Sequence, residues 1–594
     1  MTSTGPSRSG ALSDAHPVEL LITAGLAVAA IVAGFGWLVA HTAARLAGHP
    51  IAVSLSDAMH GLADWRHHPA NPRLAFPRPA RSGLPGPIGM YGAAAIVIVT
   101  LSAVALLAAL LLRRWRVGGS RGYATAGDVR RALSETAARS RGRAAGQPAS
   151  GATVALGVDA RSRQGLFGAA EDSYLYLGPP RSGKGVHLII PQTIDAPGAA
   201  LVTATRPDTL RHTLALRAKR GPVAVFDPQH LAGDHLPRLR WAPQHGCENP
   251  LVAITRARAL AAGAQLSPAT VTDAEFWSGM TQAVLRCYLH AAALEQRSMR
   301  DVLTWTARPG DPTPVRILRA HPDAAPGWVE ELVAQAAADP RQRDSVWAGV
   351  RRAVDSLADP RVLDTCSPAP ADAVDLASFI QAGGTLYLLG TTGAQLTVAP
   401  LVTALVEALV DTARTLGAAT ADGRLDPPLT VLLDEAANIA PIPSLPHLLA
   451  DGGGSGITTI CVLQSLAQAR ARWGQAGADA MWDAATTKVI LGGLAHAEDL
   501  HRISQLAGDI DDPVTTRTHG AGGASTSTAP RRLPALPVDA LRTLPPGNAI
   551  VLARRTPPIR AKLTPWWDGP HARRIHTALK APAAPSLTPR PDAA

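Results

Sequence analysis

The chain has 594 residues, a formal net charge of +11 and a pI near 10.0, and 46% of its residues are hydrophobic. This length allows about three to four domains with a large core. The positive charge suits nucleic acid or an anionic membrane surface. The codon bias of a GC-rich genome, with a basic stretch beside a membrane, explains it equally well. The four cysteines are far apart, which argues against a disulfide framework or a zinc site and predicts reduced, buried thiols: Cys247, Cys287, Cys366 and Cys461.

Two apolar runs near the N-terminus predict transmembrane helices at about 20–40 and 89–112. Each has the roughly 20 residues that cross the hydrocarbon core. A cleaved signal peptide fits the first run poorly, because that run is too long and follows Asp14 and Glu19 instead of a basic cluster. Three arginines follow the second run, which places that end in the cytoplasm: Arg113, Arg114 and Arg116. The loop between the two spans then faces outward, and the protein is a multi-pass protein of the cell membrane.

Residues 118–151 are rich in Arg, Ala, Gly and Ser and predict a linker or a poorly packed helix. From Asp172 onward, short apolar runs alternate with helical stretches, which indicates βα units and a mostly parallel sheet. The predicted strands are Tyr174–Leu177, Ala200–Thr203, Val223–Phe226, Thr385–Leu389, Leu429–Leu433, Thr458–Leu463 and Val489–Leu491. Between Pro250 and about Val374 the pattern is helical only, which predicts an all-helical insertion. Residues 511–530 are expected to form a loop, and residues 581–594 to be disordered.

The segment Gly178–Gly185 reads G-x-x-x-x-G-K-G and lies between a predicted strand and an apolar helix. That context is typical of a P-loop, whose N–H groups and helix N-terminus bind phosphate. The predicted nucleotide-binding residues are Gly178, Pro179, Pro180, Arg181, Ser182, Gly183, Lys184, Gly185 and Val186. Lys184 supplies a positive charge for the β- and γ-phosphates. Gly185 stands where Ser or Thr usually gives Mg²⁺ a hydroxyl, so the metal must rely on water and on carboxylates elsewhere; Ser182 is a less obvious substitute.

A second segment, PPLTVLLDEAANI, predicts an apolar strand that ends at Asp434 and Glu435. We expect this strand to lie next to the P-loop strand, where Asp434 holds Mg²⁺ through water. Glu435 then polarises the attacking water as a general base. The alternative for the pair is an ordinary acidic helix start.

A third segment, GITTICVLQSLAQARARWG, predicts a strand that ends near Gln464. A polar side chain at that place can sense the γ-phosphate, so Gln464 joins the predicted catalytic residues. Arg470 and Arg472 on the following helix are candidates to act on a neighbouring subunit as arginine fingers, although a solvated helix face explains them as well.

Taken in order, several segments resemble the TraG/TraD-type coupling proteins of conjugation and type IV secretion systems: the two spans, GPPRSGKGVHLIIPQ, LVTATRPD, VFDP, LLDEAANI, VLQSLAQARARWG and LPPGNAIVLARRTPPIRAKLTPWW. The resemblance implies a RecA-like P-loop ATPase motor with an inserted all-α domain. It implies a membrane domain at 1–116, a linker at 117–170, motor segments at 171–254 and 375–570 around the insertion at 255–374, and a disordered tail at 571–594.

The same resemblance implies ATP and Mg²⁺ as cofactors, an anchor in the inner-membrane lipid, a cytoplasmic motor and a homo-hexamer. Its implied partners are single-stranded DNA, a relaxase or other relaxosome proteins, and components of the secretion channel. Two alternatives stay open. One is a substrate-recruiting platform with little ATP hydrolysis. The other is an FtsK-type translocase of double-stranded DNA, although neither the further spans nor the winged-helix module of that class is visible.

Overall fold

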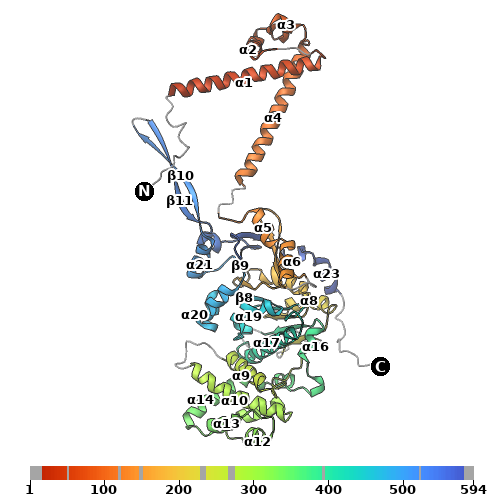
Figure 1. Ribbon diagram of the computed structural model, residues 1–594, viewed down its shortest axis with the longest axis vertical. Helices are drawn as coiled ribbons and strands as arrows, with labels where there is room; N and C mark the ends of the chain where they lie inside the picture. Colours follow the sequence, from red (N-terminus) through yellow and green to blue (C-terminus); the bar gives the residue numbers. More distant parts are fainter. Residues whose placement is uncertain are drawn as a thin grey trace, which may run out of the picture. The chain divides into compact units, whose positions relative to one another are not determined.

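The computed structural model describes residues 17–49, 53–117, 122–145, 151–227, 236–264, 274–390, 395–520 and 523–580. The chain divides into two compact units, Met1–Gly119 and Ser120–Ala594 (Figure 1). Each unit is described by itself below. The predicted disordered segment 581–594 lies outside the described residues.

The first unit is helical. Its helices are α1 (Pro17–Leu46), α2 (Leu55–Asp64), α3 (Arg78–Arg81) and α4 (Pro87–Val117). Buried residues of α1, α2 and α4, with Phe76 between them, form a small core. Within the described residues, one helix is long and apolar enough to cross a membrane, α4 over Pro87–Ala108. The first predicted span, Leu20–Ala40, lies within α1, and its role as a second span stays a prediction.

The second unit is built on a sheet of eleven strands in the order β2-β1-β13-β12-β9-β3-β8-β7-β4-β6-β5. The seven strands from β9 to β5 are parallel, and β2, β1, β13 and β12 are antiparallel to their neighbours. The parallel strands are β3 (Tyr174–Leu177), β4 (Ala200–Ala204), β5 (Val223–Phe226), β6 (Thr385–Leu389), β7 (Leu429–Leu433), β8 (Ile457–Leu463) and β9 (Thr487–Leu491). All seven predicted strands are therefore confirmed, and so is the mostly parallel sheet.

Helices cover the sheet, and nearly every side chain of the parallel strands is buried between two core clusters. Burial on both faces explains why these strands read as continuous apolar runs in the sequence. Around the sheet lie α7 (Ile190–Asp195), α8 (Asp208–Arg217), α16 (Leu376–Gln381), α17 (Gln395–Ala418), α18 (Ala436–Ile439), α19 (Leu445–Asp451), α20 (Leu466–Ala484), α21 (Ala497–Ala507) and α22 (Val538–Arg542).

The chain between β5 and α16 forms a helical body at one end of this unit (Figure 1). Its helices are α9 (Pro250–Ala264), α10 (Ala274–Leu294), α11 (Met299–Ala307), α12 (Pro312–Ala320), α13 (Trp328–Ala336), α14 (Pro340–Val354) and α15 (Pro360–Thr365). The long helix α10 packs against α9, α12, α13 and α14. Buried aromatic side chains such as Trp347 and Tyr288 fill the space between these helices.

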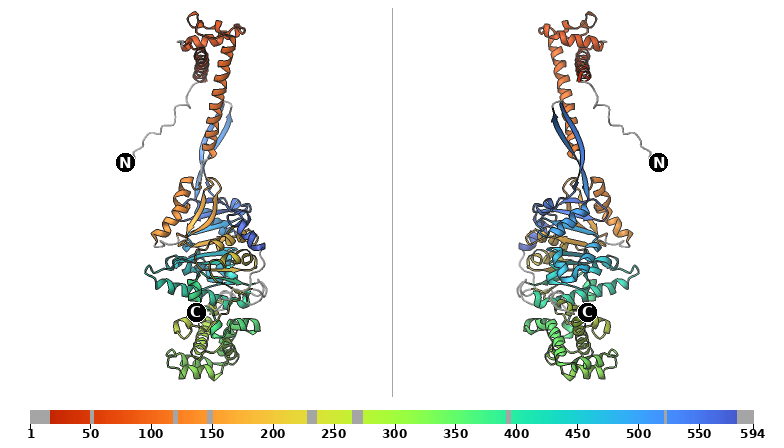
Figure 2. Two further views of the ribbon diagram at one scale, coloured as in Figure 1. Left: turned by 90° about the vertical axis from the view of Figure 1, so that its right-hand side faces the viewer. Right: turned by 90° about the vertical axis from the view of Figure 1, so that its left-hand side faces the viewer.

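The predicted loop at 511–530 is wrong. Residues 509–534 form a long antiparallel hairpin of β10 (Asp509–Gly520) and β11 (Gly523–Pro534) that projects from the end of the unit opposite the helical body (Figure 2). The hairpin is paired by its own two strands, and none of its side chains that the structure describes is buried. It therefore lacks the hydrophobic alternation by which a half-buried strand is recognised in a sequence.

The predicted linker at 117–170 is also wrong. Among its described residues are α5 (Ala126–Leu133), α6 (Glu135–Ala144), β1 (Thr153–Asp159) and β2 (Gly165–Ala169), and the two strands extend the main sheet. Strands β12 (Asn548–Ala553) and β13 (Ile559–Lys562) from the C-terminal part join them to the parallel strands. The predicted tail likewise begins too early, because α23 (Ala572–Lys580) packs against α8 through Ile575.

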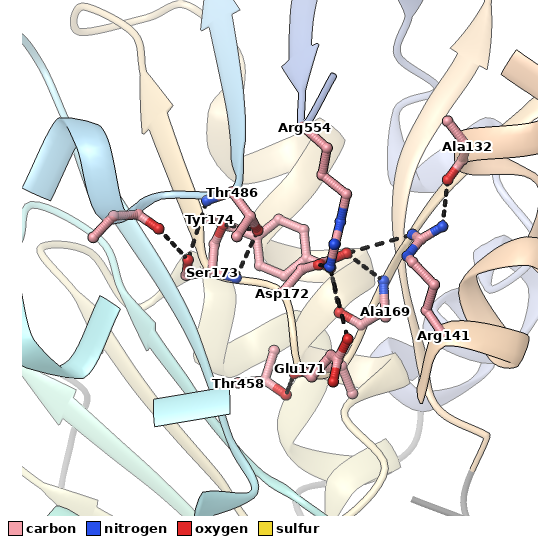
Figure 3. Close-up of polar contacts among 12 residues, drawn as sticks. Ala132, Arg141, Ala169, Glu171, Asp172, Ser173, Tyr174, Thr458, Thr486 and Arg554 are labelled. Atoms are coloured by element: carbon pink, nitrogen blue, oxygen red, sulfur yellow. Dashed lines mark hydrogen bonds and ion pairs between the residues drawn. The ribbon is translucent and has the colours of Figure 1, made fainter. Parts of the chain in front are cut away.

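A buried ionic cluster fixes this N-terminal segment to the sheet (Figure 3). Asp172, which precedes β3 and is almost fully buried, forms ion pairs with Arg141 of α6 and with Arg554 after β12. The carboxylate of Asp172 also accepts a hydrogen bond from the backbone N–H of Ala169, at 2.8 Å. A buried carboxylate needs such partners, so three segments that are distant in sequence are held at the start of the P-loop strand.

Candidate nucleotide site

The candidate site lies where three neighbouring strands end. Strand β8 pairs with β3 on one side and with β7 on the other, so the carboxyl ends of all three meet at one edge of the sheet. Gly178, Gln464 and Asp434 are the first residues after these strands. The prediction that the Asp434 strand adjoins the P-loop strand is therefore wrong. β8 lies between them, and this order puts Gln464 between the phosphate loop and the acidic pair.

The loop after β3 has the backbone that a phosphate loop needs. Gly183 has φ +85°, and a Cβ there would lie 2.7 Å from the ring of His187. His187 Nδ1 lies 2.8 Å from the carbonyl oxygen of Gly183. Arg181 has φ +64°, which is rare for a residue with a side chain and is found at functional sites. A short π-helical turn, Gly185–Ile189, begins directly after Lys184.

Lys184 is buried and points into the site. Its side-chain ammonium donates to the carbonyl oxygen of Gly178 at 3.2 Å and to Oε1 of Glu435 at 3.3 Å. The second contact joins residues 251 positions apart in the sequence. The structure thus brings together the predicted phosphate-binding lysine and the predicted general base.

Glu435 is held by more than this ion pair. The side-chain amide of Gln464 donates to both carboxylate oxygens, at 2.8 Å and 2.7 Å. Asn438 in α18 donates to Oε2 at 3.0 Å. The backbone of Glu435 is left-handed, with φ 56° and ψ 41°, which turns its side chain back over the strand ends. Asn438 was missed by the sequence analysis, and its place three residues after Glu435 was the available signal.

Asp434 has the chemistry of a metal ligand. Its Oδ1 is buried and accepts no hydrogen bond from any of the described residues. Burial and the neighbouring Glu435 raise the pKa of Asp434 to about 6, and Lys184 opposes this shift. A buried carboxylate oxygen without a partner is costly unless a ligand satisfies it. The site therefore fits Mg²⁺, with Asp434 as the residue that would hold it, directly or through water.

Gly185 stands where a P-loop usually has a Ser or Thr hydroxyl for Mg²⁺, and Ser182 carries the hydroxyl that this loop does contain. A Cβ at Gly185 would meet no atom within 4 Å, so there is space for water beside the loop. The hydroxyl of Ser182 is buried and has no hydrogen-bond partner within the described chain. It lies 2.7 Å from the place that a Cβ of Gly178 would take, so it faces the start of the loop. Pro179, Pro180 and Val186 complete the loop, and their contact with a nucleotide stays a prediction.

The two candidate arginine fingers are engaged within their own chain. Arg470 forms an ion pair with the buried Asp499 at 2.5 Å. Arg472 donates to the carbonyl oxygen of Ala437 at 3.0 Å, and burial lowers its pKa. These contacts give both arginines a role in the packing of α20 within this chain. To act in the site of a neighbouring subunit, each arginine would first have to break its contact.

We expect Asp434→Asn to stabilise the protein in the absence of nucleotide and Mg²⁺. The pKa of this carboxyl rises from 3.8 to about 6 on folding, so the folded state holds the proton more tightly. Stability is then lost as the pH rises through about 4 to 6, by at most ~3 kcal/mol, and this cost is fully present above pH 6. Thermal unfolding of both proteins at several pH values measures the effect. A gain in Tm that does not shrink below pH 6 contradicts this account of Asp434.

Residues 428–546 match a family model described as the TraM recognition site of TraD and TraG. This stretch begins just before β7 and contains the acidic pair, Gln464 and the hairpin. This match supports the resemblance of the chain to the TraG/TraD-type coupling proteins.

Two solved structures have a similar fold. The bacterial conjugative coupling protein TrwBdeltaN70, in its unbound monoclinic form, is similar with a TM-score of 0.51 and 18% identity over 66% of this chain and 85% of that chain. Its trigonal form in complex with sulphate has a TM-score of 0.50 and 16% identity, covering 73% and 93%. At these identities the likeness shows the fold. No curated protein matches the chain by sequence.

Proposed function

We propose that this coupling protein is a membrane-anchored ATPase that recruits a relaxase-bound DNA strand, or a protein substrate, to a type IV secretion channel and drives its transfer. The observation that carries the ATPase assignment is the buried cluster of Lys184, Glu435 and Gln464 beside the unsatisfied oxygen of Asp434. A purely structural cluster would satisfy its own polar groups. Perturbed, incompletely satisfied groups at the carboxyl edge of a parallel sheet indicate a ligand site.

Each residue of this cluster has a role in the proposal. The N–H groups of the loop and the ammonium of Lys184 bind the phosphates of ATP. Asp434 would hold Mg²⁺, and the bound ion would neutralise charge on the phosphates. Glu435 accepts a proton from the attacking water, and Gln464, which contacts Glu435 from the end of β8, reports the state of the γ-phosphate to α20.

The membrane anchor is proposed from α4. A core helix of this length would bury its apolar side chains, but many of those on α4 are exposed, including Ile88 at 91% and Val99 at 67%. Lipid would cover these side chains. With the arginines that follow, this orientation leaves the motor in the cytoplasm. The second span in α1, and hence a multi-pass anchor, belongs to the same proposal.

The partners are proposed from the family. The matching model is named for recognition of TraM, so residues 428–546 are a candidate surface for a relaxosome protein. The hairpin β10–β11 lies within these residues and projects into solvent from this unit (Figure 2). Assembly as a homo-hexamer and contact with channel components complete the proposal.

We expect the detergent-solubilised full-length protein to bind single-stranded DNA with a steep salt dependence. Arginine contacts with phosphates release counterions, so log K should fall with log salt by about 0.7 per neutralised phosphate. The net charge of +11 favours such contacts, and turnover of ATP should rise when DNA is present. A labelled oligonucleotide titrated at several salt concentrations, with parallel ATPase assays, measures both.

The same assays separate the alternatives. A protein that binds nucleotide and substrate but hydrolyses little ATP with or without DNA is a recruitment platform. Stimulation by double-stranded DNA alone favours an FtsK-type translocase. If DNA neither binds to nor stimulates an enzyme that hydrolyses ATP, recruitment of protein substrates becomes the main function.

A further inference from the structure

Three donor groups surround the carboxylate of Glu435: the ammonium of Lys184 and the side-chain amides of Gln464 and Asn438. Lys184 and Gln464 donate to Oε1 at 3.3 Å and 2.8 Å. Gln464 and Asn438 donate to Oε2 at 2.7 Å and 3.0 Å. An ionised carboxylate has about four lone-pair sites for hydrogen bonds. The Nε2 of Gln464 is shared between both oxygens, and the ammonium of Lys184 covers Oε1 on the side of the phosphate loop, where it keeps Glu435 from accepting a proton from water.

These donors differ in how easily they can leave. Gln464 begins the segment after β8, its N–H donates to the side chain of Gln468 in α20, and Asn438 lies within α18. Both amides are therefore positioned by secondary structure beside the sheet. Lys184 is on the phosphate loop itself, and its ammonium is the group that phosphates attract most strongly. It is the one donor that an incoming nucleotide would remove.

We propose that Asn438 is a positioning residue, and that it forms with Gln464 an amide clamp that holds the carboxylate of Glu435 in place, while Lys184 keeps this base inactive until nucleotide draws the lysine away. This inference rests on the proposed ATPase function. When Lys184 turns to the phosphates, one site on Oε1 becomes free, and it is the site that faces the phosphate loop. The clamp holds the other sites, so the freed lone pair points toward the position of the attacking water. Nucleotide binding itself then switches the base on.

The clamp also explains the backbone of this segment. A left-handed residue other than Gly costs free energy, and it persists only where the surroundings require it. Glu435 adopts this conformation immediately before α18, which begins at the next residue. The side chain of Asn438, within α18, then contacts Oε2 of Glu435. The N–H of Asn438 also donates to the carbonyl oxygen of Glu435 at 2.8 Å, which closes the turn. Side chain and main chain thus fix the two residues to each other.

The test is a double-mutant cycle between Asn438 and Glu435, read by single-turnover hydrolysis and by binding of a fluorescent ATP analogue. Asn438→Ala should lower hydrolysis about tenfold, the effect of one lost charge-assisted hydrogen bond, and change nucleotide affinity by less than about threefold. In a Glu435→Gln background it should lower the residual rate no further, because the carboxylate that it positions is gone. An equal loss in both backgrounds overturns the proposal.

The isosteric variant separates positioning from packing. Asn438→Asp keeps the shape of the side chain, but it cannot donate and it places a second negative charge beside Glu435, so it should hydrolyse more slowly than Asn438→Ala. A residue needed only for packing would tolerate this change, and wild-type hydrolysis by Asn438→Asp also overturns the proposal. If Asn438→Ala does not fold, Asn438→Asp carries the test alone.

Two controls complete the design. Asn249→Asp makes the same chemical change at the exposed start of α9, where Asp caps a helix as well as Asn does, and it should leave hydrolysis unchanged. Binding of the fluorescent ATP analogue is also compared between the parent protein and Lys184→Ala. Weaker binding by this variant tests the proposed nucleotide site separately from the clamp. If the analogue does not bind the parent protein, the proposed function fails. If it binds and is hydrolysed while both Asn438 variants behave as the parent, only the clamp fails.

Discussion

Lys184→Ala should abolish nucleotide-dependent function while leaving the fold intact. Its buried ammonium donates both to the loop carbonyl of Gly178 and to the carboxylate of Glu435. A hydrogen bond to a charged group contributes about 1.5–3 kcal/mol, so ATP affinity should fall by a factor between about 10 and about 150. Transfer of substrate, which needs turnover, should fall below detection.

The fold should survive because the partner left behind is still satisfied. Glu435 keeps its contacts with Gln464 and Asn438 when Lys184 is removed. The matched control is Lys219→Ala, which removes the same side chain from an exposed position after α8. Equilibrium binding of a fluorescent nucleotide and the thermal unfolding of all three proteins decide the matter. Unchanged affinity in Lys184→Ala would sink the assignment of the nucleotide site.

The parallel strands were predictable because they are buried on both faces. Strands β3, β5, β6 and β7 begin and end at the predicted residues, since each is a short apolar run bounded by Gly, Pro or charged residues. The same boundaries placed Asp434 and Gln464 at strand ends. Parallel strands end at one edge, so their proximity to the phosphate loop followed from the pattern alone.

The order of those strands did not follow from the pattern. Nothing local to β8 indicates that it inserts between β3 and β7, because strand order is decided by long-range packing. For the same reason β1 and β2 were missed. They are held to the sheet by pairing with β13 from the far end of the chain and by the cluster around Asp172. The contact of Asn438 with Glu435 depends on one left-handed residue, which composition and spacing do not reveal.

Glu435→Gln should separate binding from hydrolysis. A positioned general base contributes about 10²- to 10⁴-fold to the rate, and an amide cannot accept the proton, so turnover should fall by that factor. Affinity for ATP should rise instead of falling. In the parent protein nucleotide must first break the ion pair between Lys184 and Glu435, whose side chains are only 10% and 12% exposed. The variant has no such ion pair to break, so binding should tighten several-fold.

This pattern distinguishes a base from a structural acid. If Glu435 only held Lys184 in place, its neutral isostere would weaken binding and turnover together. If it is the base, single-turnover hydrolysis falls while the fluorescent nucleotide stays bound. Glu498→Gln, the same change at an exposed position in the first turn of α21, should affect neither measurement. Hydrolysis at the parent rate in Glu435→Gln would mean that another group activates the water. The carboxylate of Glu435 would then serve only to hold Lys184 until nucleotide arrives.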